Sequence, residues 1–218
     1  MSATAMDRGL LAMAAVPSSA RPGIGQSPEG VSDAEIMLRV KTGDESAFQY
    51  LVEKYRRPMV NFMYRMAHNA AAAEDLAQEV FLRVYRSRDG YEASAKFTTW
   101  LYRIATNLAV NHARDTRNER PEKMASLDEP ADETGLTMDV PDGSLSAEEM
   151  LLRRERLAAI RQRVQALPER QRMAVAMHKY QHMDYRQIGE VLKLSESATK
   201  SLLFRAYETL RQQLKEFI

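Results

Sequence analysis

Side chains able to bind nucleic acid recur every three or four positions near the carboxyl end of the chain. On a helix capped by Ser195 they share one outer face, formed by Ser197, Lys200, Ser201, Phe204 and Arg205, opposite Ala198, Leu202, Ala206 and Leu210. Lysine and arginine bond phosphates or guanine edges, serine bonds either, and phenylalanine can cover a thymine methyl group. The pattern predicts a face that reads duplex DNA, with an ordinary solvated helix face as the alternative.

A second polar face is expected on a helix from about Thr98 to Arg117. One side carries Trp100, Arg103, Asn107, Asn111 and Arg114, and the other carries Leu101, Ile104, Ala105, Leu108 and His112. Aromatic and amide groups beside arginines suit stacking on unpaired bases and bonding to base edges, while Lys96 and Arg103 can meet phosphates. The alternative is that Trp100 packs against the loop before it.

A third face mixes acids, an amide and an exposed leucine at helical spacing. Its members are Asp75, Gln78, Glu79, Leu82 and Arg86, opposite Leu76 and Val80. A leucine ringed by polar groups favours a protein-docking surface. A solvated helix with one exposed leucine is the alternative.

The sequence shows no pattern that requires catalysis. His178 and His182 are four residues apart and could share a metal ion, but no third ligand lies near them in the sequence. A phosphate-binding glycine-rich loop, a nucleophile elbow and a recognisable acid pair are all missing. We therefore predict no catalytic residue, no metal, no cofactor and no small-molecule substrate.

The formal net charge of +1 conceals an uneven distribution of charge along the chain. Residues 119–147 carry −6, whereas residues 33–118 carry +2 and residues 148–218 carry +5. Such asymmetry favours an electrostatic partner such as DNA. The lack of cysteine fits a reducing compartment. No apolar run approaches the roughly 18 residues of a membrane span, so we expect a cytoplasmic protein without membrane insertion.

Two stretches lack helical periodicity. Residues 1–31, rich in Ala, Ser, Pro and Gly, are predicted to be a disordered tail, and the acidic residues 119–145, interrupted by Pro and Gly, a flexible linker. A capping-box spacing follows each stretch, at Ser32–Glu35 and at Ser146–Glu149. Each box indicates the start of a folded domain.

The first domain, residues 32–118, is predicted to be a compact helical bundle. An apolar stripe begins after Asp44 and continues past Pro58, where we expect a break or a kink and therefore two core-facing helices. Further helices are expected around residues 76–84 and 98–117. Residues 146–218 are predicted to form the second domain.

In the second domain, Pro168 suits the first position of a helix. A short helix containing Ile188 follows, then a tight turn at Lys193–Leu194 and the helix capped by Ser195. This arrangement predicts a helix-turn-helix. The chain is therefore expected to be all-α, with two small helical domains.

Four strings carry a family resemblance. They are DLAQEVFLRVYR (75–86), FTTWLYRIATNLAVNHAR (97–114), ALPERQRMAV (166–175) and DYRQIGEVLKLSESATKSLLFRA (184–206). In order and spacing they resemble an extracytoplasmic-function (ECF) sigma factor of the sigma-70 family, over about residues 33–118 and 146–216. The resemblance implies a region 2-like and a region 4-like domain.

The resemblance also implies a role and partners. Such a factor directs core RNA polymerase to promoters and assists promoter melting; its partners are the polymerase clamp helices and flap, promoter DNA and an anti-sigma factor. The implied polymerase-docking residues are Asp75, Leu76, Gln78, Glu79, Phe81 and Leu82, with a core role for Phe81 as the alternative. The implied minus-ten residues are Lys96, Phe97, Thr98, Trp100, Arg103, Asn107, Asn111 and Arg114. The implied minus-thirty-five residues are Ser197, Lys200, Ser201, Phe204 and Arg205.

Three residues depart from the family pattern. Lys193 stands where many members have glycine in the turn, and Leu202 and Tyr207 stand where arginine is frequent. A left-handed residue other than glycine costs about 1 kcal/mol, so we expect the turn to be formed differently. Fewer arginines imply fewer phosphate contacts and a shallower salt dependence.

The leading alternative is a stand-alone helix-turn-helix regulator. Residues 33–117 would then sense a signal or dimerise, and the protein would bind a palindrome without polymerase. The Trp100 to Arg114 face argues against this, because a sensor has no need of a nucleic-acid-like face there. A pure protein adaptor is disfavoured by the +5 charge of residues 148–218.

Overall fold

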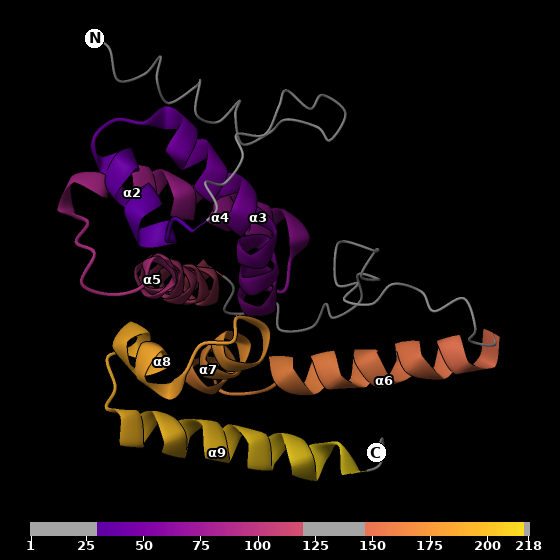
Figure 1. The fold of residues 1–218 in the computed structure, drawn as a ribbon. Helices are drawn as coiled ribbons and strands as arrows, with labels where there is room; N and C mark the ends of the chain where they lie inside the picture. The colour runs from indigo at the N-terminus through magenta and orange to yellow at the C-terminus, as the bar shows by residue number, and fades with distance from the viewer. Residues whose placement is uncertain (1–29, 120–146, 216–218) are drawn as a thin grey trace.

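The computed structural model describes residues 30–119 and 147–215, and within them every regular element is helical. The first group contains α2 (Asp33–Lys41), α3 (Glu45–Ala67), α4 (Ala70–Arg86), the 3-10 turn η1 (Arg88–Gly90) and α5 (Phe97–Glu119). The second contains α6 (Ala147–Gln165), α7 (Glu169–Tyr180), α8 (Tyr185–Leu192) and α9 (Glu196–Gln213) (Figure 1). The all-α prediction is confirmed.

Several expectations fall on residues that the structure does not describe. They are most of the N-terminal tail, all of the linker except Glu119, and the capping box at Ser146. These remain predictions.

Polar side chains begin most of the described helices. The capping box predicted at Ser32 is present: its hydroxyl accepts from the Glu35 amide at 3.3 Å, and the Glu35 carboxylate accepts from the Ser32 amide at 2.8 Å. Asp44 and Asn69 cap α3 and α4. Pro168 precedes α7 as its N-cap, one position before the place we predicted.

The division into two helices predicted at Pro58 is wrong, because α3 continues through this residue. Proline removes one helical hydrogen bond and crowds the preceding turn. Leu51 before it and Met59 and Phe62 after it are all buried in the same core. Burial of this continuous apolar face on both sides offsets the local cost.

An aromatic cluster fixes α5 against the rest of the first group. The ring centroids of Tyr55 and Phe97 are 5.4 Å apart, and those of Tyr91 and Trp100 are 5.0 Å apart. The Tyr55 hydroxyl donates to the Asp33 carboxylate at 2.6 Å, which ties α3 to α2. These contacts set the rotation of α5 and so determine which of its faces is outward.

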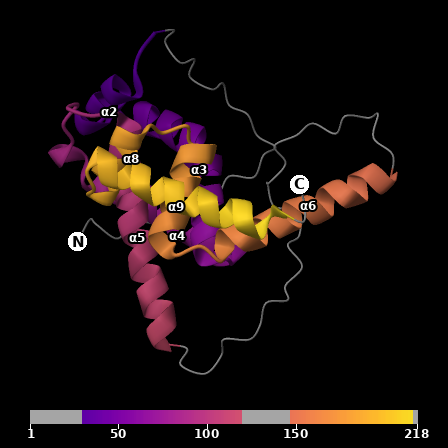
Figure 2. The same cartoon turned by 90° about the horizontal axis from the view of Figure 1, so that it is seen from below.

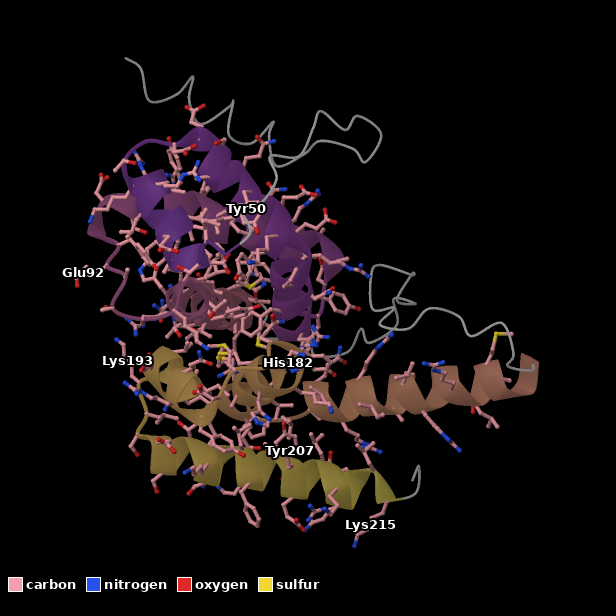
Figure 3. The ribbon with its side chains drawn as sticks, in the orientation of Figure 1. Tyr50, Glu92, His182, Lys193, Tyr207 and Lys215 are labelled. Carbon is pink, nitrogen blue, oxygen red and sulfur yellow. The ribbon has the colours of Figure 1, made fainter. Side chains whose placement is uncertain are left out.

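Helices α8 and α9 form the predicted helix-turn-helix, and its turn uses a left-handed residue. Lys193 has φ 55° and ψ 52°, so the expectation of a differently formed turn is wrong (Figure 3). The Leu194 amide donates to the Gly189 carbonyl at 2.8 Å, closing the turn. A Cβ at Gly189 would lie 2.7 Å from the Leu194 carbonyl oxygen, so only glycine fits there.

The two groups pack against each other, with α8 next to α5 and α7 next to α3 (Figures 1 and 2). The Arg103 guanidinium donates to the Glu190 carbonyl at 3.3 Å. The Arg65 guanidinium carbon lies 3.8 Å from the centroid of the Tyr180 ring. Burial lowers the pKa of Arg65, while Tyr180 opposes that change by favouring the charged guanidinium.

Replacing Lys193 with glycine should stabilise the second group. Glycine adopts the left-handed conformation without the Cβ clash, so Lys193→Gly should raise the free energy of unfolding by about 0.5–1 kcal/mol. Chemical denaturation measures this change. Gly189→Ala is the opposing control and should be destabilising, since the atom it meets is backbone. An unchanged or lower stability of the Lys193 variant would contradict the strain assigned to this turn.

The Arg65–Tyr180 contact should show energetic coupling between the two groups. A double-mutant cycle with Arg65→Ala and Tyr180→Ala should give a coupling free energy of about 0.5–2 kcal/mol in denaturation experiments. Arg56→Ala, an exposed arginine on the same helix, should show no coupling to Tyr180. Additive effects of the Arg65 and Tyr180 substitutions would count against the contact.

Candidate functional site

The outer face of α9 presents all five residues predicted to read duplex DNA. Ser197, Lys200, Ser201, Phe204 and Arg205 are exposed, and 68% of the Phe204 surface is accessible. Tyr185 and Tyr207 help to line an open groove along this face. The second helix of a helix-turn-helix thus carries a solvent-facing set of cationic, hydroxyl and aromatic groups.

Local contacts partly occupy the polar groups on this face. Lys200 pairs with Glu196 at 2.8 Å, and the carboxylate raises the pKa of the ammonium. The Ser201 hydroxyl donates to the Ser197 carbonyl at 3.0 Å, and Arg205 donates to the Ser201 carbonyl at 3.3 Å. A phosphate or a base edge would have to replace these contacts.

The buried side of α9 is shifted by one residue from the prediction in the first half of the helix and agrees with the prediction at Ala206 and Leu210. Thr199, Leu203, Ala206 and Leu210 are buried, whereas Ala198 and Leu202 are only partly so. The Thr199 hydroxyl donates a hydrogen bond to the Ser195 carbonyl at 3.0 Å, within the same helix turn. A threonine whose hydroxyl is bonded in this way can be buried. A prediction that considers only apolar residues places its apolar neighbour in the core instead.

Tyr207 performs a packing role at a position where the family often has arginine. Its hydroxyl lies 2.8 Å from Nδ1 of His178, and burial raises the pKa of the phenol (Figure 3). The His178 ring also stacks on Tyr185, at 5.4 Å between centroids. His178 is thus engaged by two aromatic residues. No cluster of metal-binding side chains occurs within residues 30–119 and 147–215.

The outer face of α5 exposes most of the residues expected to meet unpaired DNA. Lys96, Arg103, Asn107, Asn111 and Arg114 are exposed, while Thr98 and Trp100 are partly buried. The second half of α5 extends away from the body of the molecule (Figure 2). Trp100 packs on Tyr91 in the loop before the helix, as the alternative interpretation held, yet keeps part of its surface accessible.

Phe97 does not belong to this outer face. It is 2% exposed and lies against Tyr55, Tyr91 and Trp100. Its place in the core follows from its position four residues before the buried Leu101, on the same side of the helix. Phe97 is therefore buried in this structure, and the minus-ten role that the resemblance implies for it stays a prediction.

The face of α4 separates into an outer and an inner part. Asp75 is exposed, and Gln78, Glu79 and Leu82 are partly exposed; Glu79 pairs with Arg83 at 2.7 Å. Phe81 is 7% exposed and Leu76 packs against the core. The alternative core role holds for Phe81, and Leu76 shares it.

Sequence reasoning missed the part of this surface that α3 supplies. A small groove lies between the two helices and is lined by Val52, Arg56, Val60, Glu74, Gln78 and Phe81. Residues 52, 56 and 60 recur every four positions on α3, which is the pattern of one helix face. That spacing would have identified them if both faces of α3 had been considered.

None of the helices in the two described ranges is long and apolar enough to cross a bilayer.

Comparisons with known proteins match both groups of helices. Residues 51–119 match the family model for sigma-70 region 2, and residues 157–210 match that for sigma-70 region 4. The chain is 35% identical over 181 residues to the ECF RNA polymerase sigma factor SigW of Bacillus subtilis, covering 82% of this chain and 94% of that protein. It is 33% identical to the RNA polymerase sigma-H factor of Pseudomonas aeruginosa, covering 85% and 95%.

Two solved structures share the fold. CnrH in complex with the cytosolic domain of CnrY gives a TM-score of 0.62 at 18% identity, covering 85% of this chain and 99% of that one. The sigma factor RpoE of Bartonella quintana, in complex with the anti-sigma factor NepR, gives 0.60 at 18%, covering 77% and 96%.

One assignment follows from the order of the two matched regions, the helix-turn-helix, and the identity to curated relatives over nearly their whole length. The chain belongs to the ECF group of the sigma-70 family of RNA polymerase sigma factors.

Proposed function

We propose that this chain binds core RNA polymerase in the cytoplasm, directs it to a particular class of promoters and carries no chemistry of its own. The observation that carries the proposal is the α9 face, whose five expected DNA-reading residues are all exposed on the second helix of a helix-turn-helix. The other two surfaces support it.

Core polymerase docks on the outer part of α4. Leu82 supplies an apolar anchor, and Asp75, Gln78 and Glu79 surround it with acceptors and an amide. Arg56 and Val60 extend the same surface onto α3. An apolar anchor ringed by polar groups is the common anatomy of a protein interface.

Unpaired DNA of the minus-ten element contacts the outer face of α5. Asn107 and Asn111 can bond base edges, Arg103 and Arg114 can bond phosphates, and the accessible part of Trp100 offers a stacking surface. Thr98 and Lys96 lie at the start of this face. A base extruded from the duplex would be received beside Trp100.

The duplex minus-thirty-five element is read by α9. Phe204 is placed to contact a thymine methyl, and Lys200, Arg205 and the two serines to contact phosphates or guanine edges. Pairing of Lys200 with Glu196 leaves less free positive charge than the sequence suggests. We therefore expect a modest salt dependence for this contact.

The two DNA-reading helices must separate before both elements are bound. Elements named for positions about 25 base pairs apart are roughly 80 Å apart along B-DNA at 3.4 Å per base pair. Here α8 lies directly against α5, and Arg103 donates to its backbone. The intervening residues 120–146 can span at most about 90 Å. Chain length therefore permits the separation.

A regulatory protein partner is also expected. The two structures reported above are each complexes of a protein of this fold with a second protein. We propose that an anti-sigma factor binds this chain and covers the polymerase-docking surface of α4.

Substitution of the α4 surface should strongly weaken binding to core polymerase. Removing one leucine anchor and two hydrogen-bonding groups, in the triple variant Asp75→Ala, Gln78→Ala, Leu82→Ala, should weaken binding by roughly 3 kcal/mol, about 100-fold. Fluorescence anisotropy of the labelled full chain titrated with core enzyme measures this loss.

A matched triple variant controls for general damage. Leu38→Ala, Asp89→Ala, Glu92→Ala also removes one exposed leucine and two polar groups from the first domain and should bind normally. Equal loss in both variants would contradict the α4 surface. If the wild-type chain does not bind core enzyme but binds duplex DNA alone, the result would favour a stand-alone regulator.

Substitution of Arg205 should weaken promoter binding in a salt-dependent way. Loss of one phosphate contact should lower the slope of log affinity against log salt by about 1, measured with the full chain on core polymerase. Lys179→Ala removes an exposed cation from α7 and should leave the slope unchanged. Identical slopes for wild type and Arg205→Ala would remove Arg205 from the interface.

A further inference from the structure

His178 on α7 contacts side chains from both helices of the helix-turn-helix. Its Nδ1 atom lies 2.8 Å from the hydroxyl of Tyr207, which is on the side of α9 that faces α7 (Figure 3). Its ring stacks on Tyr185 at the start of α8, with 8° between the two ring planes. The Tyr207 ring also meets the His178 ring at 65°, with 5.9 Å between centroids. One imidazole therefore joins α7, α8 and α9.

Tyr185 extends these contacts to the face of α9 that is expected to read DNA. Its side chain is 37% exposed. It lines the open groove on this face together with Lys200, Ser201, Phe204 and Arg205. The Lys200 ammonium nitrogen lies 5.8 Å from the centroid of the Tyr185 ring, within the range of a cation–π contact. The contacts therefore run from Tyr207 through His178 and Tyr185 to Lys200.

The two ends of this series lie on the same helix. Lys200 and Tyr207 are seven residues apart on α9, about two helical turns, and so share one side of it. The paired rings of His178 and Tyr185 thus contact α9 at two points along its length. The position of α9 and the position of Tyr185 are coupled through these rings.

The hydrogen bond to Tyr207 fixes the plane of the His178 ring. The outer side-chain torsion of histidine is broad, so rotamer preference alone does not set this plane. A directional bond at Nδ1 does set it, with one group donating and the other accepting according to the tautomer. A rotated imidazole is no longer parallel to Tyr185, which then loses its support. An exposed tyrosine that is free to move must be ordered when DNA binds, and this ordering weakens binding.

We propose that His178 is a positioning residue for minus-thirty-five recognition: bonded to Tyr207 and stacked on Tyr185, it holds one wall of the DNA-reading groove in place before DNA binds. His178 acts through Tyr185 and needs no contact with DNA itself. Tyr207, which stands where the family often has arginine, then contributes order to the groove instead of a phosphate contact. This inference rests on the proposed reading of the minus-thirty-five element by α9.

Nitrogen-15 NMR of the free full chain tests the contacts without DNA or polymerase. The chain has four histidines, so single substitutions can assign the imidazole signals of His178. Tyr207→Phe removes only the hydroxyl and should shift the Nδ1 resonance of His178. Tyr102→Phe, which removes a buried hydroxyl without a hydrogen-bond partner among the described residues, should not. An unshifted resonance in Tyr207→Phe would contradict the bond.

Promoter binding tests the consequence for DNA. Core polymerase carrying the wild-type chain first selects duplexes from a pool randomised in both promoter elements. The probe is one recovered duplex, and its control is the same duplex with the minus-thirty-five segment scrambled. The ratio of the two affinities reports minus-thirty-five recognition, because polymerase and minus-ten contacts are common to both duplexes.

Loss of the bond should lower this ratio. Tyr207→Phe and His178→Phe should each lower it about threefold to tenfold, through the ordering cost of Tyr185. The double variant should lower it no further than either single variant, because both remove the same bond. Tyr102→Phe should leave the ratio unchanged.

His178→Asn separates positioning from stability. An asparagine amide can still bond to the Tyr207 hydroxyl but offers no ring on which Tyr185 can stack. We expect the ratio to fall as in His178→Phe, while thermal unfolding of the full chain stays close to that of wild type. A ratio that remains at the wild-type value in His178→Asn would overturn the positioning role.

The promoter experiment distinguishes failure of this role from failure of the proposed function. A wild-type ratio near one would overturn the minus-thirty-five role of α9 and, with it, the role of His178. A high wild-type ratio that neither Tyr207→Phe nor His178→Phe lowers would overturn only the role of His178.

Discussion

Helix α5 packs on two sides at once, and the arrangement of the molecule depends on this. Its inner side, with Phe97 and Leu101, is buried against the other helices of the first group. Its outer side meets α8, where Arg103 donates to the Glu190 backbone. Because the aromatic cluster sets the rotation of α5, it also sets which side chains face α8 and which face solvent. The proposed melting surface and the contact between the two groups of helices therefore share one helix, and use of the whole surface for DNA requires loss of the contact.

Local signals in the sequence were enough to predict most helices. Capping residues such as Ser32 and Ser195 satisfy the first amides of a helix by themselves, so their effect does not depend on distant contacts. Errors arose where distant packing overrides a local rule. Pro58 lies inside α3 because core contacts on both sides hold the helix together. Lys193 is a different case, because its left-handed conformation occurs in a turn that the bond from the Leu194 amide to the Gly189 carbonyl closes locally.

For the candidate surfaces too, local spacing predicted some residues, whereas distant packing decided others. The α9 face follows from helical spacing alone, and every residue expected on it is exposed. Phe97 and Phe81 are buried although the resemblance groups them with surface residues, because a resemblance assigns a role to a segment, whereas burial is decided residue by residue. The contact of Arg65 with Tyr180 joins residues far apart in the sequence, and no spacing rule could have paired them.

The hydrogen bond from Arg103 to the backbone of residue 190 affects which substitutions these two positions can accept. The acceptor is a main-chain carbonyl, which every amino acid carries. Substitution of Glu190 by another helix-compatible residue leaves the acceptor in place, whereas substitution of Arg103 removes the donor. This hydrogen bond therefore constrains only Arg103, and the two positions would not show compensating substitutions. Related chains could keep this contact while residue 190 varies freely between them.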